Sequence, residues 1–372
     1  MIDERLRRAA GALERSVEGV DVLERLEALG RRRRRQRTTT AVLAVLAVAA
    51  VLGGAVLGVR TLRSTDPVAG PPPAAPPAPA RVVTTIPITN RPIAVATGAG
   101  AVWVATGNPT WVYRIDPATG QGITSIAVPP VPTSLAATQD AVWVLSPADG
   151  SVSRIDPATN QLVATIPVEG KPSGLAVGAG AVWVTSARDG TVARIDPAAG
   201  WVVDTIPVGR APGGLTVAGG AVWVALPERG GLGRIDPASN RLTVVPVPRC
   251  CDGDLAAGEG ALWAANRLDG TLVRLDPASG RVAARVQLPR TTDQRPHEVA
   301  VGEGAVWVTS ASARGGTANL LWRVDPASNQ LTSTTDLGPT AAGGLPNDVA
   351  AGYGAVWAAG TDLDSLTRLQ PG

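Results

Sequence analysis

The hydrophobic positions of this chain fall into short runs, each bounded by glycine, proline or aspartate. In the copy spanning residues 174–208, apolar or alternating runs occupy 174–177, 181–186, 191–195 and 202–208. Alternation over so few residues is typical of β-strands, and Gly and Pro interrupt every stretch long enough for a helix. The pattern therefore predicts a unit of four antiparallel strands, with a two-residue hairpin at Asp189-Gly190.

This unit is copied along the chain at a period of about 40 residues. The phrase Gly-x-Gly-Ala-Val-Trp-Val recurs with small changes, and a second phrase, Arg-Ile-Asp-Pro-Ala, follows it in register. The tryptophans of the first phrase are Trp103, Trp143, Trp183, Trp223, Trp263, Trp307 and Trp357. Because they hold one position in every copy, we interpret them as packing residues. A fixed period predicts one supersecondary unit, repeated and stacked.

Both faces of the strand at 181–186 carry apolar or small residues, so both faces need covering. A ring of blades covers each sheet with its two neighbours. The last copy stops at 366–369 without a fourth strand, whereas residues 81–88 match the fourth strand at 162–168. We therefore predict an all-β, seven-bladed β-propeller over residues 81–372, closed by the N-terminal strand in the last blade.

With these two phrases, residues 81–372 resemble the seven-bladed propellers of the YVTN, NHL and streptogramin (virginiamycin B) lyase-like group. The resemblance implies a fold more than an activity. For the lyases it implies histidine chemistry with a metal held by carboxylates. His297 is the only histidine of this chain, and no Asp or Glu cluster with ligand spacing accompanies it, so we expect no metal and no cofactor.

The N-terminal part differs in composition from the repeats. Residues 38–59 carry no charge and are long enough to cross a bilayer as a helix. Six arginines within residues 31–37 precede them, which favours a cytoplasmic N-terminus. We predict a transmembrane helix at 38–60 that anchors an extracytoplasmic propeller in the cell membrane, with a cleaved signal peptide as the alternative.

The segments on either side of this helix have their own patterns. Residues 1–37 show amphipathic spacing and are predicted to be a cytoplasmic helical arm, either docking a partner or lying on anionic lipid. Residues 61–80 form a Pro- and Ala-rich linker. Residues 1–80 carry a net charge of +5 and the remainder −2, so the ring offers no basic surface for nucleic acid.

Three insertions, of four, five and five residues, fall in loops that we expect on the same face of the propeller, in adjacent blades. They lie in the segments 291–297, 311–319 and 338–347. Loops can also lengthen without a function, but their confinement to one sector is the best pointer to a binding surface. The residues that we expect to bind a ligand there are Arg249, Cys250, Cys251, Asp252, Arg295, His297, Glu298, Trp322, Asn347 and Asp348.

Two of these positions carry chemistry with alternative interpretations. His297 is a weak candidate for a general acid or base, or a polar surface residue. Cys250 and Cys251 are adjacent, and in an oxidising compartment they can form a vicinal disulfide that covers a ligand as a hydrophobic lid, remain free thiols, or bridge another chain. Trp322 lies outside the main register and is either a ligand platform or packed beneath its loop.

These observations favour a binding module rather than an enzyme. We predict a sensor or scaffold whose insertion-bearing face holds an envelope protein or a small ligand. The alternative is a lyase of the streptogramin type that acts through His297.

Overall fold

The computed structural model describes residues 78–248, 250–289, 294–312, 318–339, 346–360 and 364–372. The predicted arm, transmembrane helix and most of the linker lie outside these residues. Among the residues described, no helix combines the length and the apolar character that a membrane crossing requires.

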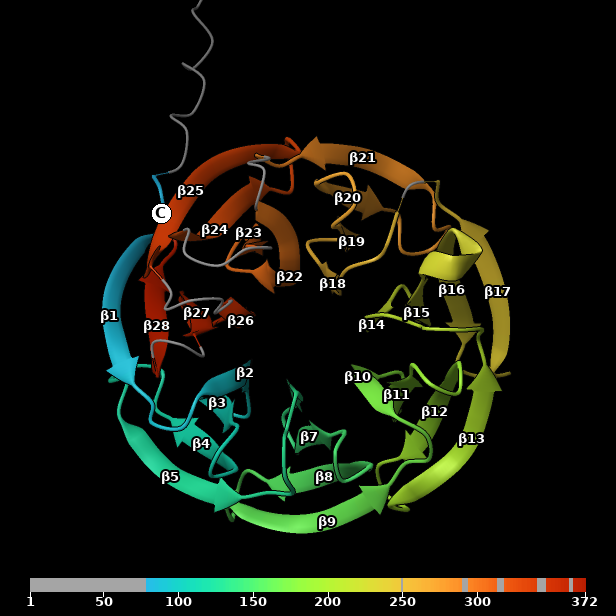
Figure 1. Cartoon of the computed structure of the whole chain (residues 1–372), viewed down its shortest axis with the longest axis horizontal. Coiled ribbons are helices and arrows are strands. Elements are labelled where there is room, and N and C mark those ends of the chain that lie inside the picture. The colour runs from blue at the N-terminus through green and yellow to red at the C-terminus, as the bar shows by residue number, and fades with distance from the viewer. Residues whose placement is uncertain (1–77, 249, 290–293, 313–317, 340–345, 361–363) are drawn as a thin grey trace, which may run out of the picture. The chain divides into compact units, whose positions relative to one another are not determined.

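Seven four-stranded antiparallel sheets form a closed ring (Figure 1). Blades 1 to 3 comprise β2 (Pro92–Gly98), β3 (Ala101–Thr106), β4 (Trp111–Ile115), β5 (Gly122–Ala127); β6 (Ser134–Ala137), β7 (Val142–Ser146), β8 (Ser151–Asp156), β9 (Gln161–Pro167); and β10 (Pro172–Gly178), β11 (Ala181–Ser186), β12 (Thr191–Asp196), β13 (Trp201–Pro207). Blades 4 and 5 comprise β14 (Leu215–Ala218), β15 (Ala221–Leu226), β16 (Gly231–Asp236), β17 (Arg241–Pro246); and β18 (Leu255–Gly258), β19 (Ala261–Asn266), β20 (Thr271–Leu275), β21 (Val282–Gln287).

Blades 6 and 7 comprise β22 (Gln294–Gly302), β23 (Ala305–Ser312), β24 (Ala318–Asp325), β25 (Gln330–Pro339); and β26 (Pro346–Gly352), β27 (Ala355–Gly360), β28 (Ser365–Gln370), β1 (Arg81–Pro87). A single 3₁₀ turn, η1 (Pro227–Arg229), interrupts the strands of the described residues. In each blade the first strand lines the centre of the ring and the fourth forms its rim (Figure 1).

The ring closes as predicted, because β1 pairs antiparallel with β28. The register places Arg81 opposite Gln370 and Pro87 opposite Ser365. Ile88 follows the strand, and its N–H donates to the Asp364 carbonyl at 2.7 Å. Strands from the two ends of residues 78–372 therefore share one sheet.

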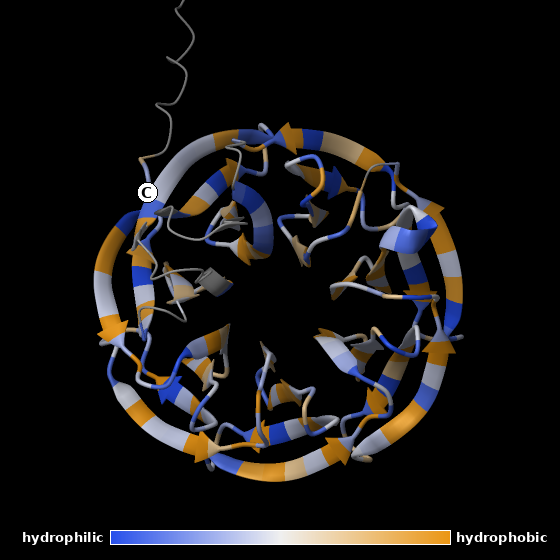
Figure 2. Ribbon diagram, viewed as in Figure 1, coloured by the Kyte–Doolittle hydropathy of each residue, from blue (hydrophilic) through white to orange (hydrophobic). Residues whose placement is uncertain are grey.

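The core lies between the blades. The seven repeated tryptophans are at most 1% exposed and belong to the apolar clusters that join neighbouring sheets, which confirms that they are packing residues. The rim strands instead mix hydrophobic, intermediate and hydrophilic residues (Figure 2). Burial of the second strand on both faces, for example throughout β11, is what the apolar pattern predicted.

A polar latch adds to this packing. In blades 1 to 3 and 5 to 7 an arginine lies over the tryptophan of its own blade, as for Arg194, whose Cζ is 5.3 Å from the Trp183 ring centroid. The same guanidinium donates to the Pro237 carbonyl at 2.8 Å and to Asn240 Oδ1 at 3.0 Å in the next blade. The equivalent arginines of blades 1, 2 and 5 likewise donate to the next blade.

The predicted two-residue hairpin at Asp189-Gly190 is wrong. Strands β11 and β12 are paired through Ser186 and Thr191, so the loop contains four residues. The Gly190 N–H donates to the Ser186 carbonyl at 2.9 Å, and only Gly190 of the Asp-Gly pair takes a positive φ, 68°. A type I′ turn needs positive φ at both central residues, which explains the difference.

Candidate functional site

One position of the repeat distinguishes the blades from one another. It immediately precedes the apolar residue at which each first strand packs into the core. In blades 1 to 7 the residues there are Ala94, Ser134, Gly174, Gly214, Asp254, Glu298 and Asp348. Three consecutive blades thus carry a carboxyl group at a place where the other four carry small residues.

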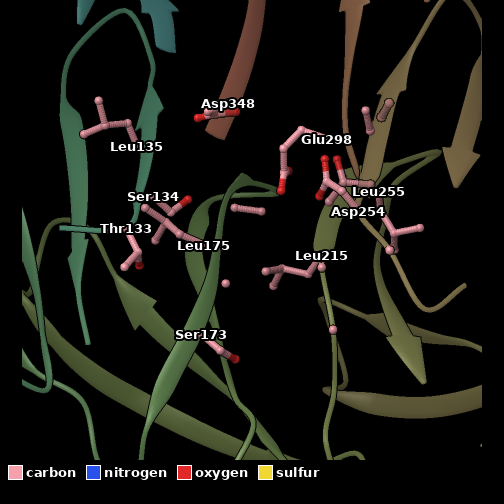
Figure 3. A pocket seen from close by; sticks show the side chains of 18 of the residues that line it. Thr133, Ser134, Leu135, Ser173, Leu175, Leu215, Asp254, Leu255, Glu298 and Asp348 are labelled. Carbon is pink, nitrogen blue, oxygen red and sulfur yellow. The ribbon is translucent and has the colours of Figure 1, made fainter. Parts of the chain in front are cut away.

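The six positions in blades 2 to 7 line a cavity of about 650 Å³ at the centre of the ring. Asp254, Glu298 and Asp348 lie along one side, and Ser134, Gly174 and Gly214 lie among the other lining residues (Figure 3). Because the second group has little or no side chain, the space facing the acids stays open. Thr133, Ser173, Asp252 and Arg267 add further polar groups to the lining.

Backbone N–H groups of the following blades hold two of the carboxylates. The Val299 N–H donates to Asp254 Oδ2 at 3.1 Å, and the Val95 N–H donates to Asp348 Oδ2 at 2.9 Å. The Val349 N–H also donates to Asp348 Oδ1 at 2.8 Å. Each of these aspartates therefore links two blades and has a fixed orientation at the cavity wall.

Glu298 stands between these two aspartates in blade order and has a different environment. Burial raises the pKa of the Glu298 carboxyl well above its ordinary value, and the charges of Asp254 and Asp348 raise it further. A hydrogen bond with Asp254 also favours the protonated form of Glu298. The proton in the hydrogen bond between Glu298 and Asp254 therefore belongs to Glu298, because a backbone N–H donates to the Asp254 carboxylate and stabilises the charge of Asp254.

Burial also raises the pKa of Asp348, to about 7, against the lowering effect of its two backbone donors; the Asp254 charge adds to the increase. The pKa of Asp254 is raised by burial too, and Arg267 opposes that increase. The guanidinium of Arg267 lines the cavity, and its Nε is buried without a hydrogen-bond partner among the described residues. One fixed positive charge thus faces several carboxyl groups.

His297 contacts this cluster without belonging to the cavity lining. Its Nδ1 lies 3.1 Å from Glu298 Oε1, and its side chain is 18% exposed. Burial, and secondarily the charge of Arg267, lower the pKa of His297 to about 4, so the imidazole is neutral at neutral pH. Because the imidazole is neutral, this short contact is not an ion pair at neutral pH.

Several of the residues predicted to bind ligand meet at this place. Asp252, Glu298 and Asp348 line the cavity, and the Asp252 carboxylate also accepts the Arg267 N–H at 2.7 Å. Arg295 is exposed in β22 and does not line the cavity. Arg249 and the side chain of Asn347 lie outside the described part of the chain.

The structure corrects two further expectations. Cys250 and Cys251 form the vicinal disulfide, but at 9% and 0% exposure they pack in the core between blades 4 and 5. They therefore do not form a lid over a ligand. Trp322 is 0% exposed in the core between blades 5 and 6, so it is a packing residue and offers no platform for stacking.

Asp254 and Arg267 were absent from the predicted site, although both line the cavity. Aligning the repeats one residue before each buried Leu or Val of the first strand would have shown Asp254 beside Glu298 and Asp348. The insertions obscure this alignment, because the spacing between equivalent positions changes from 40 to 44 and then 50. Arg267 carried no comparable signal.

No protein-family model and no curated protein sequence matches the chain. Solved structures do resemble it. A chain of the Kuenenia stuttgartiensis hydrazine synthase structure is 16% identical with a TM-score of 0.62, covering 77% of this chain and 98% of that one. A chain of a mitotic checkpoint complex structure is 13% identical with a TM-score of 0.64, covering 84% and 99%. The computationally designed Ika8 protein is 13% identical with a TM-score of 0.56, covering 78% and 99%. At these identities the likeness establishes a β-propeller fold and nothing about activity.

Proposed function

We propose that this chain is a membrane-anchored β-propeller that binds a small polar ligand in the central cavity of an extracytoplasmic ring. One observation carries the ligand-binding part: carboxyl groups at one repeat position in blades 5 to 7 face small residues at the same position in blades 2 to 4, around about 650 Å³ of space. A cavity with a few convergent polar groups of perturbed pKa is the usual form of a ligand site.

The energetic argument supports binding rather than packing. Half-buried carboxyl groups that raise one another's pKa destabilise the fold when they ionise, because their ionised forms repel each other and lose solvation. A latch of the Arg194–Asn240 kind would join the blades without this cost. The presence of Glu298 and Asp348, which resist ionisation in the free protein, is better explained by a ligand whose charge compensates the charge of their carboxylates.

The membrane part of the proposal rests on the sequence alone. The uncharged segment 38–59 and the arginines before it support an anchor with residues 1–37 in the cytoplasm. In this arrangement the ring would report ligand binding, or present its ligand, outside the membrane. Protease protection in intact cells tests the topology: the ring should be digested, and a tag placed before residue 1 should survive.

A blocking variant tests ligand binding. Ser134 lines the cavity and is not part of the interblade core, so Ser134→Trp fills the space with little effect on packing. We expect some members of a panel of small polar compounds to raise the unfolding temperature of the full chain and to lose that effect in Ser134→Trp. Ligands that stabilise both proteins equally would place binding elsewhere, and a panel without any stabilising member would count against the function.

Lyase activity through His297 remains the second candidate. The observation in its favour is the 3.1 Å contact between His297 Nδ1 and Glu298 Oε1 beside the cavity. Incubation with a streptogramin B antibiotic, followed by mass spectrometry of the products, tests it. Conversion that disappears in His297→Ala would support the lyase, whereas no conversion by the unaltered chain would remove it.

A further inference from the structure

We propose that the cavity recognises a small hydrophilic organic cation, with ammonium or guanidinium groups, on the acids of blades 5 to 7. This inference deepens the proposed function and rests on it. Its first support is the charge of the lining: Asp252, Asp254, Glu298 and Asp348 bring four carboxyl groups, against the one guanidinium of Arg267. With all five groups ionised the formal charge of the lining is −3.

The second support is the shape and chemistry of the remaining wall. Ser134, Gly174 and Gly214 keep the space open, and Thr133 and Ser173 bring hydroxyl groups to it. A large apolar ligand would find few partners here. A short chain with polar ends would reach the acids through charge-assisted hydrogen bonds and leave the rest of the cavity to water.

The arrangement of the acids favours an extended cation over a single metal ion. Among the described residues, no three His, Cys, Asp or Glu side chains lie close enough together to hold one ion. Asp254 and Asp348 are instead held apart by backbone donors in two different blades, Val299 N and Val95 N. Their separation suits a molecule with positive charge at more than one point.

Protonation follows from this chemistry. In the free protein the carboxyl groups of Glu298 and Asp348 retain protons to higher pH than ordinary acids, with a pKa of about 7 for Asp348. The charged groups that face them are Asp252, Asp254 and Arg267, and His297 beside them is neutral. A bound cation stabilises the ionised carboxylates, so binding releases protons and strengthens as the pH rises through this range.

Three compounds of equal length and different charge test the inference on the full chain in nanodiscs. Putrescine carries two ammonium groups, butanediol is neutral, and succinate carries two carboxylates. Isothermal titration calorimetry should show binding of putrescine alone. Its affinity should increase by about tenfold between pH 6 and pH 8, with protons released to the buffer. The reason is linkage: releasing up to one proton on binding raises the affinity by up to about tenfold for each pH unit.

Two variants with the same charge change provide the control. Glu298→Gln removes a carboxyl group from the cavity and should weaken putrescine binding at pH 8 by at least about tenfold. Glu259→Gln removes an exposed carboxyl group from the β18–β19 turn and should leave binding unchanged. Ser134→Trp should abolish it.

Each other outcome overturns the inference in a recognisable way. If butanediol binds as well as putrescine, or Glu298→Gln binds putrescine normally, the cavity does not select for positive charge. If none of the three compounds binds while other compounds stabilise the protein in a manner sensitive to Ser134→Trp, the cation inference fails and the proposed function stands. If that wider panel also fails, both fall together.

Discussion

At the residue scale, Glu298 shows how neighbours rather than residue type determine chemistry. The same carboxyl group on the surface, as in Glu259, is solvated, whereas Glu298 is enclosed between Asp254 and Asp348. Its folded-state pKa lies above the unfolded value, so the folded protein binds the proton more tightly. This contribution to stability is complete below the unfolded pKa of about 4.5 and is lost as the pH rises through the folded pKa.

Glu298→Gln should therefore change how stability depends on pH. A neutral amide can donate a hydrogen bond to Asp254 at every pH, so the variant should match the unaltered protein near pH 4 and exceed it at pH 8 by about 1 kcal/mol or more. Chemical unfolding at a series of pH values measures this difference. Glu259→Gln serves as the reference and should follow the unaltered protein throughout. A Glu298→Gln variant less stable at pH 8 would show that the carboxylate is compensated in the free protein.

The sequence showed His297, Glu298 and Asp348 but could not show their states. Lowering of the His297 pKa to about 4 depends on burial and on Arg267, which is 30 residues away in the chain. Likewise, the small residues that share the cavity with the acids, such as Gly174, are recognised in the sequence only once the blades are aligned around a ring. Residue-level chemistry here follows from three-dimensional packing that no local pattern contains.

At the element scale, the blade-to-blade latch comes in two forms. The residue that ends the Asp-Pro turn is Asn160, Asn240 or Asn329 in blades 2, 4 and 6, with φ between 55° and 58°. In blades 1, 3 and 5 a glycine takes this left-handed position. Arg114, Arg194 and Arg274 thus gain an amide acceptor in the next blade, whereas Arg154 has only the Pro197 carbonyl, at 3.2 Å.

Gly200→Asn should complete the latch between blades 2 and 3. No atom lies within 4 Å of a Cβ built at Gly200, and asparagine already takes this conformation in the sister blades. The added amide oxygen can accept from Arg154, so we expect the free energy of unfolding to rise by roughly 0.5–1 kcal/mol, measured by urea denaturation.

Gly280→Asn is the matched comparison. A Cβ at Gly280 would lie 2.8 Å from Cη2 of Trp223. The indole ring of Trp223 is fully buried and has no space into which it could shift. The same substitution should therefore destabilise at this blade by about 1–3 kcal/mol, as overpacking does. Equal effects at the two glycines would mean that the latch geometry does not control the outcome.

The sequence predicted these elements well, with a local exception. Strand order, the Asp-Pro-Ala turns and the packing role of tryptophan follow from a pattern repeated in every blade. The Asp189-Gly190 hairpin was wrong because the Asp-Gly signal does not fix the number of residues in a loop. Register across the loop, Ser186 with Thr191, is decided by which residues must face the core.

At the scale of the whole molecule, we expect closure of the ring to make the seven sheets unfold as one cooperative unit. Each blade covers its two neighbours, and a missing strand in blade 7 would leave the edge of β28 open. The match between residues 81–88 and internal fourth strands predicted this closure, because a repeat protein must complete its last unit. By contrast, the pairing partner of an isolated N-terminal strand could not have been derived from local propensity.

The closing strand offers a direct test of this cooperativity. Ile88 is 6% exposed and packs with Val95, Trp357 and Leu366 at the junction of blades 7 and 1, whereas Val83 in β1 is 46% exposed. Ile88→Asp places a carboxylate in that core and should destabilise the ring by about 3–5 kcal/mol, while Val83→Asp should change stability by less than about 0.5 kcal/mol. If the ring is cooperative, Ile88→Asp lowers the unfolding midpoint of the whole ring in a single transition and exposes cleavage sites in several blades to limited proteolysis. Cleavage confined to residues 78–90 at an unchanged midpoint would show instead that the strand is an appendage, and that the remaining sheets hold the cavity without it.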